Sequence, residues 1–385
     1  MREVYADHAA TTFPRHPQVP EAMSSFLLDI GCSPGRGGYR RSLDASRLVY
    51  DSRALMAEFF KVPQPEQVVF TPSVTYSLNL LIKGLLQQGD HVIISSMEHN
   101  SVVRPLTRLV RERAVTLDVV QCNTDGTLDP LQVKNAINNQ TKLVVLTHAS
   151  NVTGTFLPVH EVGEILKGKD IFYAIDVAQT AGSESLGFGA MNCDYLAFTG
   201  HKGLLGPPGI GGLCISERAA EATESLVEGG TGSRSEDENQ PGFLPDKFES
   251  GTLNVPGIAG LAAGVKLVNE LGLETLQKHK RELTAALLLG LAEMPEIEVY
   301  GTKNPHTTAA TVSINVKGMD NGDLSFMLEQ GFGIMTRSGL HCSPLAHRTI
   351  GTFPQGTLRF SLGWTNTSSD VEHILSALSE IIREN

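Results

Sequence analysis

The sequence predicts an α/β protein with a mainly parallel seven-stranded sheet in a large domain and a smaller α+β domain at the C-terminal end. The chain has 385 residues, which exceeds one ordinary domain. Apolar, β-branched runs alternate with amphipathic stretches from about residue 67 to residue 216. Longer helical segments and alternating strands follow. We expect a large domain over residues 15–255 and a small domain built from residues 1–14 and 256–385.

The first part of the chain contains seven predicted strands. Most are continuously apolar, which is typical of strands buried on both faces of a sheet. Amphipathic stretches beginning at Tyr76 and Val159 separate some of them and predict βαβ units. The predicted strands are QVVF from Gln67, HVIIS from His91, LDVVQ from Leu117, KLVVLTH from Lys142, IFYAID from Ile171, DYLAFT from Asp194 and GGLCIS from Gly211.

The segment 228–251 is rich in Gly, Pro and charged residues, which predicts a long, mobile loop rather than a domain linker. A helical stretch is expected from about residue 255 to residue 294. After it, ATVSINV and TLRFSLG predict the strands of the small domain, and the N-terminal tail is expected to pack beside them.

The last helix is predicted to start at Ser369, because Glu372 three residues later completes a capping box. Apolar residues then recur at helical spacing and define one buried face. These residues are Val371, Ile374, Leu375, Leu378 and Ile382.

Composition limits the partners and the location. A formal net charge of -11 argues against a nucleic-acid or anionic-membrane partner. No run of about 18 apolar residues occurs, and the N-terminus MREVYADHAATT lacks a signal-peptide core, so we expect a cytoplasmic protein without a membrane span. The five cysteines form no CxxC pair, so neither a disulfide framework nor a metal site is expected.

The strongest local pattern is DYLAFTGHKGLLGPPGIGG, in which Lys202 follows a predicted strand directly. Ligands bind at strand ends in such sheets, and a lysine desolvated by a tight glycine-rich turn can attack a carbonyl group. Thr199 and His201 are donors well placed for an anion. Taken alone, the pattern also fits a surface lysine in a turn.

Other polar residues follow the ends of predicted strands. Asp176 closes a buried strand and could face a cation such as a protonated pyridine nitrogen, or could cap a helix. Ser73 and Thr75 begin a helix whose N-terminus would favour a phosphate, although in isolation plain capping is the better explanation. His99 and Asn151 also follow strands, and either could be purely structural.

The order of these residues resembles the class V aminotransferases, specifically the cysteine desulfurase and selenocysteine lyase branch. These are fold-type I enzymes that use pyridoxal 5'-phosphate (PLP). The resemblance covers almost the whole chain, from YADHAATT to RFSLGWTNT, and TGHK and RSGLHCSPLAH are its most specific motifs. It implies a PLP-dependent transferase fold.

The resemblance implies a role for each polar residue around the cofactor. Lys202 resembles the Schiff-base lysine, Asp176 the partner of the pyridine nitrogen, Gln179 the donor to the phenolic oxygen and His99 the residue that stacks on the ring and assists proton transfer. The residues that resemble the phosphate-binding set are Val74 (backbone), Thr75, Thr199, His201 and, from the other protomer, Thr252 in SGTLN. A homodimer is therefore implied.

The resemblance also implies the reaction. Arg359 matches the arginine that binds the substrate carboxylate, with help from Asn151, and a guanidinium suits a carboxylate. Cys342 matches the cysteine that accepts sulfur as a persulfide, in a short loop of the group II type where the electropositive turn around His341 favours a thiolate. Without the resemblance, Cys342 would be read as a small core residue.

The expected activity is conversion of L-cysteine to L-alanine with sulfur transfer to Cys342, and an acceptor protein is expected to take up that sulfur. Selenocysteine lyase, another class V C–S lyase or aminotransferase, and a non-enzymatic PLP-binding docking scaffold for sulfur carriers remain alternatives. Arg36 lies in a glycine-rich turn that resembles the mouth-lining, substrate-binding segment, or is an exposed turn residue. His8 replaces the usual asparagine of DNAAT, so a polar contact near the mouth is expected to differ.

Overall fold

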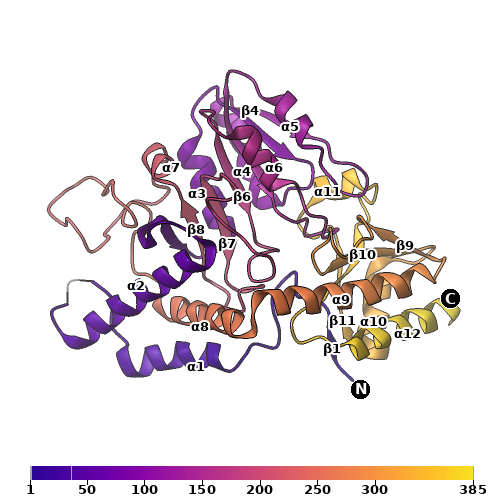
Figure 1. Ribbon diagram of the computed structural model, residues 1–385. Coiled ribbons are helices and arrows are strands. Elements are labelled where there is room, and N and C mark those ends of the chain that lie inside the picture. Colours follow the sequence, from indigo (N-terminus) through magenta and orange to yellow (C-terminus); the bar gives the residue numbers. More distant parts are fainter. Residues whose placement is uncertain (1, 36, 385) are drawn as a thin grey trace.

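The computed structural model describes residues 2–35 and 37–384, so Arg36 lies outside the described residues. Figure 1 shows its arrangement, with the large sheet and its helices followed by a smaller C-terminal unit. The helices are α1 (Gln18–Ser25), η1 (Phe26–Ile30), α2 (Arg40–Phe60), η2 (Pro65–Gln67), α3 (Val74–Leu85), α4 (Asn100–Arg113), α5 (Pro130–Ala136), α6 (Val159–Leu166), α7 (Glu217–Ala222), α8 (Val255–Leu271), α9 (Leu273–Ala292), α10 (Asn321–Phe332), α11 (Pro344–Thr349) and α12 (Ser368–Glu384).

Among the described residues, the strands form three sheets. Their bounds are β1 (Val4–Tyr5), β2 (Val68–Thr71), β3 (His91–Ser95), β4 (Thr116–Val120), β5 (Thr141–Thr147), β6 (Phe172–Asp176), β7 (Tyr195–Thr199), β8 (Gly211–Ile215), β9 (Ile297–Tyr300), β10 (Thr311–Val316), β11 (Ile334–Met335), β12 (Arg337–Gly339) and β13 (Thr357–Ser361).

The large sheet has seven strands in the order β2-β8-β7-β6-β5-β3-β4. Strand β8 runs antiparallel to both of its neighbours, and the remaining pairs are parallel. All seven predicted strands are present, so the predicted mainly parallel α/β sheet is confirmed. Continuous burial along most of these strands explains why their sequences are apolar throughout rather than alternating.

Helices cover both faces of the large sheet, as expected from the apolar strands. Along β6, Tyr173 and Ile175 join the core beneath α2, α6 and α8, while Phe172 and Ala174 join the core beneath α3, α4 and α7. Side chains of successive strand residues point to opposite faces, so one strand supplies both cores. The two cores hold the sheet rigidly and fix the positions of its strand ends.

The C-terminal part contains a four-stranded antiparallel sheet in the order β12-β13-β10-β9. Its core is built with α9, α10 and α12. The N-terminal strand β1 pairs in parallel with β11, so the tail packs beside this part as predicted. The predicted helical stretch from residue 255 is two helices, because Gly272 adopts a φ of 81° between α8 and α9. The domain boundaries at residues 14/15 and 255/256 stay a prediction.

The predicted start of the last helix is wrong. The backbone N–H of Thr367 donates to the carboxylate of Asp370 at 2.8 Å, and the N–H of Asp370 lies 3.3 Å from the Thr367 hydroxyl. This reciprocal capping box lies two residues before the predicted one. The hydroxyl of Ser369 instead accepts a hydrogen bond from Arg2, which also pairs with Asp370.

The segment 228–251 contains no helix or strand in the described structure, as predicted for a loop. Its C-terminal end is anchored by Glu249, which is 9% exposed and forms a bidentate pair with Arg53 at 2.7 and 2.8 Å. The N–H of Phe70 on β2 donates to the same carboxylate at 2.6 Å. Within the described residues, no helix is long and apolar enough to cross a membrane.

Candidate active site

The polar residues singled out in the sequence gather at the carboxyl ends of four neighbouring strands. His99 follows β3, Asn151 follows β5, Asp176 closes β6, and Lys202 follows β7. These strands are adjacent and parallel, so their carboxyl ends lie along one edge of the sheet. The fold therefore brings together residues that are up to about a hundred positions apart in the sequence.

Lys202 lies in a tight turn whose glycines are required by close packing. A Cβ on Gly203 would lie 2.3 Å from the carbonyl oxygen of Ala181, and a Cβ on Gly182 would lie 2.0 Å from the carbonyl oxygen of Gly203. The N–H of Gly206 closes the turn on the carbonyl of Gly200 at 2.8 Å. Only glycine permits these backbone segments to approach so closely, and the resulting turn places Lys202 next to the strand ends.

The surroundings of Lys202 favour its neutral amine. Burial lowers the pKa of Lys202 to about 8, while the negative charge of Asp176 opposes part of that shift. The positive charge of Arg359 lowers the pKa further. An amine with this pKa is partly deprotonated near neutral pH and can act as a nucleophile or a base.

Asp176 and Gln179 lie in the turn after β6. Asp176 is 4% exposed, and one of its carboxylate oxygens accepts the N–H of Ala178 at 2.8 Å. Burial raises the pKa of Asp176, while the charge of Lys202 opposes that shift. Gln179 donates from Nε2 to the carbonyl of Ala9 at 3.3 Å, which ties it to the N-terminal segment.

His99 caps helix α4, so its structural interpretation is also correct. Its Nδ1 accepts the N–H of Ser101 at 3.0 Å, which leaves the hydrogen of the neutral ring on Nε2. Burial lowers the pKa of His99 to about 4, with a further contribution from the charge of Lys202. A neutral, half-buried imidazole beside Lys202 is suited to stacking on an aromatic ring.

The start of α3 and the residues after β7 offer free hydrogen-bond donors. The first two N–H groups of α3, on Val74 and Thr75, have no acceptor among the described residues, although Ser73 caps the N–H of Tyr76. The buried Thr199 hydroxyl likewise has no partner there. His201 places Nδ1 3.0 Å from the Thr11 hydroxyl. Such a set of unpaired donors at a helix N-terminus suits a phosphate group.

Thr252 does not join this set within its own chain. It is exposed and lines a hollow with Tyr50 of α2, the loop residue Gly230 and the buried pair Arg53–Glu249.

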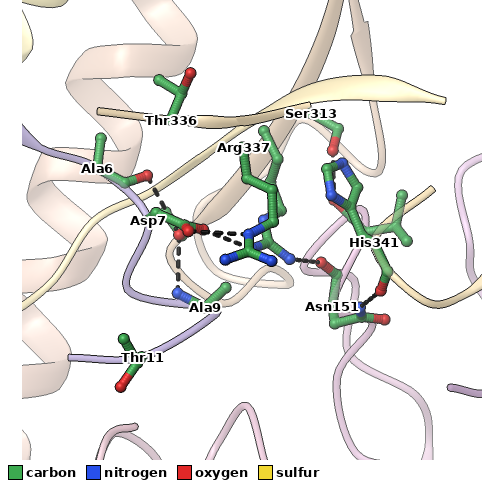
Figure 2. Close-up of polar contacts among 12 residues, drawn as sticks. Ala6, Asp7, Ala9, Thr11, Asn151, Ser313, Thr336, Arg337 and His341 are labelled. Carbon is green, nitrogen blue, oxygen red and sulfur yellow. Dashed lines mark hydrogen bonds and ion pairs between the residues drawn. The ribbon is translucent and has the colours of Figure 1, made fainter. Parts of the chain in front are cut away.

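A cluster of two arginines and one aspartate lies beside Lys202. Arg359 on β13 is buried, and its Nη2 lies 2.7 Å from Oδ1 of Asp7. Arg337 on β12 places Nε 2.9 Å from the other oxygen of the same carboxylate. Arg359 also donates to the carbonyl of Asn151 at 2.9 Å. Figure 2 shows Asp7 beside the guanidinium of Arg337, with Asn151 across the site.

Cys342 is exposed in a loop of four residues between β12 and α11. Cys342 is therefore not the small core residue that a free cysteine usually is. His341 and Cys342 both have left-handed backbones, with φ of 48° and 59°. Asn151 holds the loop on both sides, because its Nδ2 donates to the His341 carbonyl and its Oδ1 accepts the Ser343 hydroxyl, both at 2.6 Å. The Asn100 N–H at the start of α4 donates to the Cys342 carbonyl at 2.8 Å.

His8 was expected to change a polar contact near the mouth of the site, and it lies buried beside Gln179 and Lys202. His8 is 7% exposed, and neither ring nitrogen has a partner among the described residues. A Cβ on Gly363 would lie 2.2 Å from the His8 ring, so the ring packs directly against the glycine backbone. His8 lines a small cavity of about 40 Å³ with Gln179 and Lys202.

Sequence reasoning missed three charged residues at this site. Asp7 and Arg337 belong to quoted motifs, and only their partner Arg359 was recognised. Glu98 immediately precedes His99 and is fully buried, with Oε1 accepting the N–H of Thr147 at 2.9 Å. An acidic residue next to a buried strand end was the available signal for Glu98.

Comparisons with known proteins agree along the whole chain. The family model described as aminotransferase class-V matches residues 4–374. A probable cysteine desulfurase of Methanothermobacter thermautotrophicus is 35% identical, covering 98% of this chain and 94% of that protein. One of Pyrococcus abyssi is 32% identical, covering 99% and 94%. The apo structure of a cysteine desulfurase from Thermococcus onnurineus has a TM-score of 0.93 at 32% identity, covering 100% of this chain and 95% of that one. The fold is therefore that of the PLP-dependent fold-type I enzymes.

Proposed function

Because the chain belongs to the class V aminotransferase family, we propose that it is a PLP-dependent cysteine desulfurase. It converts L-cysteine to L-alanine and transfers the sulfur to Cys342 as a persulfide. One observation carries the proposal: the exposed Cys342 is held by Asn151, whose backbone carbonyl also accepts a hydrogen bond from the carboxylate-binding Arg359. The relatives named as cysteine desulfurases support the same activity.

The described residues fit PLP. The unpaired Thr199 hydroxyl and the free N–H groups of Val74 and Thr75 would bind the phosphate, together with His201. Asp176 would face the pyridine nitrogen, and Gln179 would donate to the phenolic oxygen. His99 would stack on the ring. When bound, PLP stores the electron pair released at the substrate α-carbon.

Each remaining residue has one task in the proposed reaction. Arg359 binds the substrate carboxylate, and its Nε–H, which has no partner among the described residues, is free to donate. Lys202, with a pKa lowered to about 8 mainly by burial, holds the cofactor aldehyde and then moves the α-proton. The Cys342 thiolate attacks the substrate sulfur, so an S–S bond forms while the C–S bond breaks. The electron pair of the C–S bond and one proton end on the carbon that becomes the methyl group of alanine.

The Cys342 loop is too short and too firmly held to carry sulfur far. It has four residues, two of them with left-handed backbones, and Asn151 bonds to both of its sides. We therefore propose that a sulfur acceptor approaches the exposed Cys342, rather than that the loop extends toward the acceptor. A cytoplasmic location stays a prediction.

We propose a homodimer in which Thr252 of one protomer reaches the phosphate site of the other. Thr252 is exposed and lies apart from its own chain's phosphate-binding residues. Large apolar side chains of η1 and α2 are also exposed, including Leu28 at 79% and Tyr50 at 54%. Tyr50 lines the same hollow as Thr252, so one interface would cover both. Sedimentation should give the dimer mass, and Thr252→Ala should weaken cofactor retention.

The direct test is incubation of the holoenzyme with L-cysteine. Alanine and a persulfide on Cys342, detected by mass spectrometry, are expected in equal first-turnover amounts. Lys202→Ala should remove the absorption of the linked cofactor and the activity together. Formation of neither alanine nor persulfide by the native protein would overturn the proposal.

The alternatives make different predictions for Cys342→Ala. A desulfurase loses cysteine turnover in this variant, whereas cleavage of selenocysteine can continue because selenium leaves without a thiol nucleophile. Another C–S lyase or an aminotransferase would retain its activity, and a docking scaffold would bind the cofactor without any turnover. Comparing both substrates with the native protein and the variant separates these possibilities.

A further inference from the structure

The two arginines beside Lys202 occupy positions that are directly opposite each other. Arg337 on β12 and Arg359 on β13 are cross-strand partners of an antiparallel pair, so their side chains leave the same face of the sheet. Like charges at such positions destabilise a sheet unless an anion lies between them. Asp7 is that anion, at 2.9 and 2.7 Å from the two guanidinium groups.

Asp7 is fixed by the backbone around it and not only by the arginines. It forms an isolated parallel bridge with Ser361 at the end of β13, and the N–H of His8 donates to the Ser361 carbonyl at 3.2 Å. The Asp7 side chain is 11% exposed. The carboxylate is therefore a built-in part of the site and is held there before any substrate arrives.

Two arginine charges and one aspartate charge leave the cluster with a single positive charge. Arg359, whose side chain is 3% exposed, keeps an unpaired Nε–H, and Arg337 is 51% exposed. The charges of all three residues act on the nearby amine of Lys202, so the cluster borders the position of the reacting substrate. A single excess charge matches one carboxylate.

We propose that Asp7 determines substrate specificity by matching this site to amino acids that carry one carboxylate. With an amino acid held by its α-carboxylate on Arg359, the side chain extends toward Cys342, and Arg337 lies on the strand that leads into the Cys342 loop. Without the Asp7 charge, Arg337 would be free to bind a second acidic group on that side chain. Asp7 therefore disfavours amino acids with acidic side chains, such as aspartate. This inference rests on the proposed function, because it assigns the α-carboxylate to Arg359.

The experiment is a titration of the holoenzyme with L-alanine and with L-aspartate, followed by the absorbance of the bound cofactor. Asp7→Asn removes the charge with little change of shape. In this variant the affinity for aspartate relative to alanine should rise by about tenfold over the native protein. The reason is that the positive charge of Arg337 is no longer balanced beside the ligand. An unchanged ratio, or an equal loss of affinity for both ligands, would overturn the proposal.

Arg337→Gln provides an independent test. The Arg337 side chain is half-exposed, so its substitution should disturb folding less than substitution of the buried Asp7. With Asp7 retained, this variant carries no excess charge, so both ligands should bind about tenfold more weakly; unaltered alanine binding would contradict the charge match. The double variant of Asp7→Asn with Arg337→Gln restores one positive charge and should restore the native ratio. Arg348→Gln, in an exposed arginine of α11, is the matched control and should change nothing.

The titration does not require sulfur transfer, so it can be separated from the desulfurase assignment. A protein that shows the predicted selectivity but forms no persulfide from cysteine would support the charge match and overturn the proposed activity. A protein that forms the persulfide, but whose relative affinity for the two ligands is the same with and without the Asp7 charge, would support the proposed activity and overturn the charge match.

Discussion

Replacing Glu98 with glutamine should remove a pH dependence from the stability of this protein. Glu98 is fully buried beneath the active site, and Oε1 accepts the Ser95 hydroxyl at 2.5 Å and the Thr147 N–H at 2.9 Å. Its Oε2 has no partner, and it forms no ion pair with any described lysine or arginine. Burial raises the pKa of Glu98 from 4.5 to about 8, with a smaller contribution from the charge of Asp176.

The sign follows from the direction of this shift. Because the folded protein holds the proton more tightly than the unfolded chain, Glu98 binds more protons when folded, and the free energy of unfolding falls as the pH rises between the two pKa values. One pKa unit corresponds to about 1.36 kcal/mol. From about pH 5.5 to about pH 7.5, ionisation of Glu98 therefore costs the native protein about 2–3 kcal/mol of stability.

Glutamine keeps the shape and the acceptor oxygen but cannot ionise. Urea unfolding followed by circular dichroism, at both pH values, should show that Glu98→Gln lacks this loss of about 2–3 kcal/mol. Other titrating groups are common to both proteins and cancel in the comparison. An identical pH dependence in the two proteins would refute the reasoning, because it would mean that Glu98 is already ionised in the folded state.

Glu249 provides a matched control for the same substitution. It is also buried, but it forms a bidentate pair with Arg53, which is itself 5% exposed. Glu249→Gln leaves the arginine charge buried without a partner, which costs about 3–5 kcal/mol. This loss should be present at both pH values. The two glutamates thus distinguish a buried carboxyl that remains protonated from one that is held by a cation.

Two further predictions concern the packing of Gly363 and the loop that carries Cys342. Gly363→Ala should destabilise the protein by about 1–3 kcal/mol in urea unfolding, because the new Cβ would lie 2.2 Å from the His8 ring. Adding His8→Ala to this variant should recover most of the lost stability. Asn151→Ala should slow persulfide formation on Cys342 in a single turnover by about tenfold or more, because it removes two hydrogen bonds of about 1 kcal/mol each that hold the loop. An unaltered single-turnover rate would contradict the role of Asn151.

The sheet and the strand-end residues could be predicted because their signals are local. Buried parallel strands are apolar throughout, and the polar residues that follow them must lie along one edge of the sheet. Lys202 and Asp176 were found in this way, and the structure brings both to that edge. Their roles in binding and catalysis remain predictions from the family resemblance.

The start of the last helix shows where local signals stop. The stretch TNTSSDVE contains two equivalent capping patterns, Thr367 with Asp370 and Ser369 with Glu372. Arg2, more than 360 positions away, bonds to the Ser369 hydroxyl and the Asp370 carboxylate, which favours the first pattern. The choice depends on a tertiary contact that no local window contains.

The N-terminal segment explains why the same limit applies to the active site. Asp7 bonds to the arginines of β12 and β13, the carbonyl of Ala9 accepts Gln179, and Thr12 donates through its N–H and its hydroxyl to the turn that carries Lys202. These partners are between 170 and 352 positions away. One short segment therefore connects the strands that lead to Cys342 with the turn that would hold the cofactor. A displacement of this segment would change the distance between the Lys202 amine and the Arg359 guanidinium, so the segment helps to set the geometry of the candidate site.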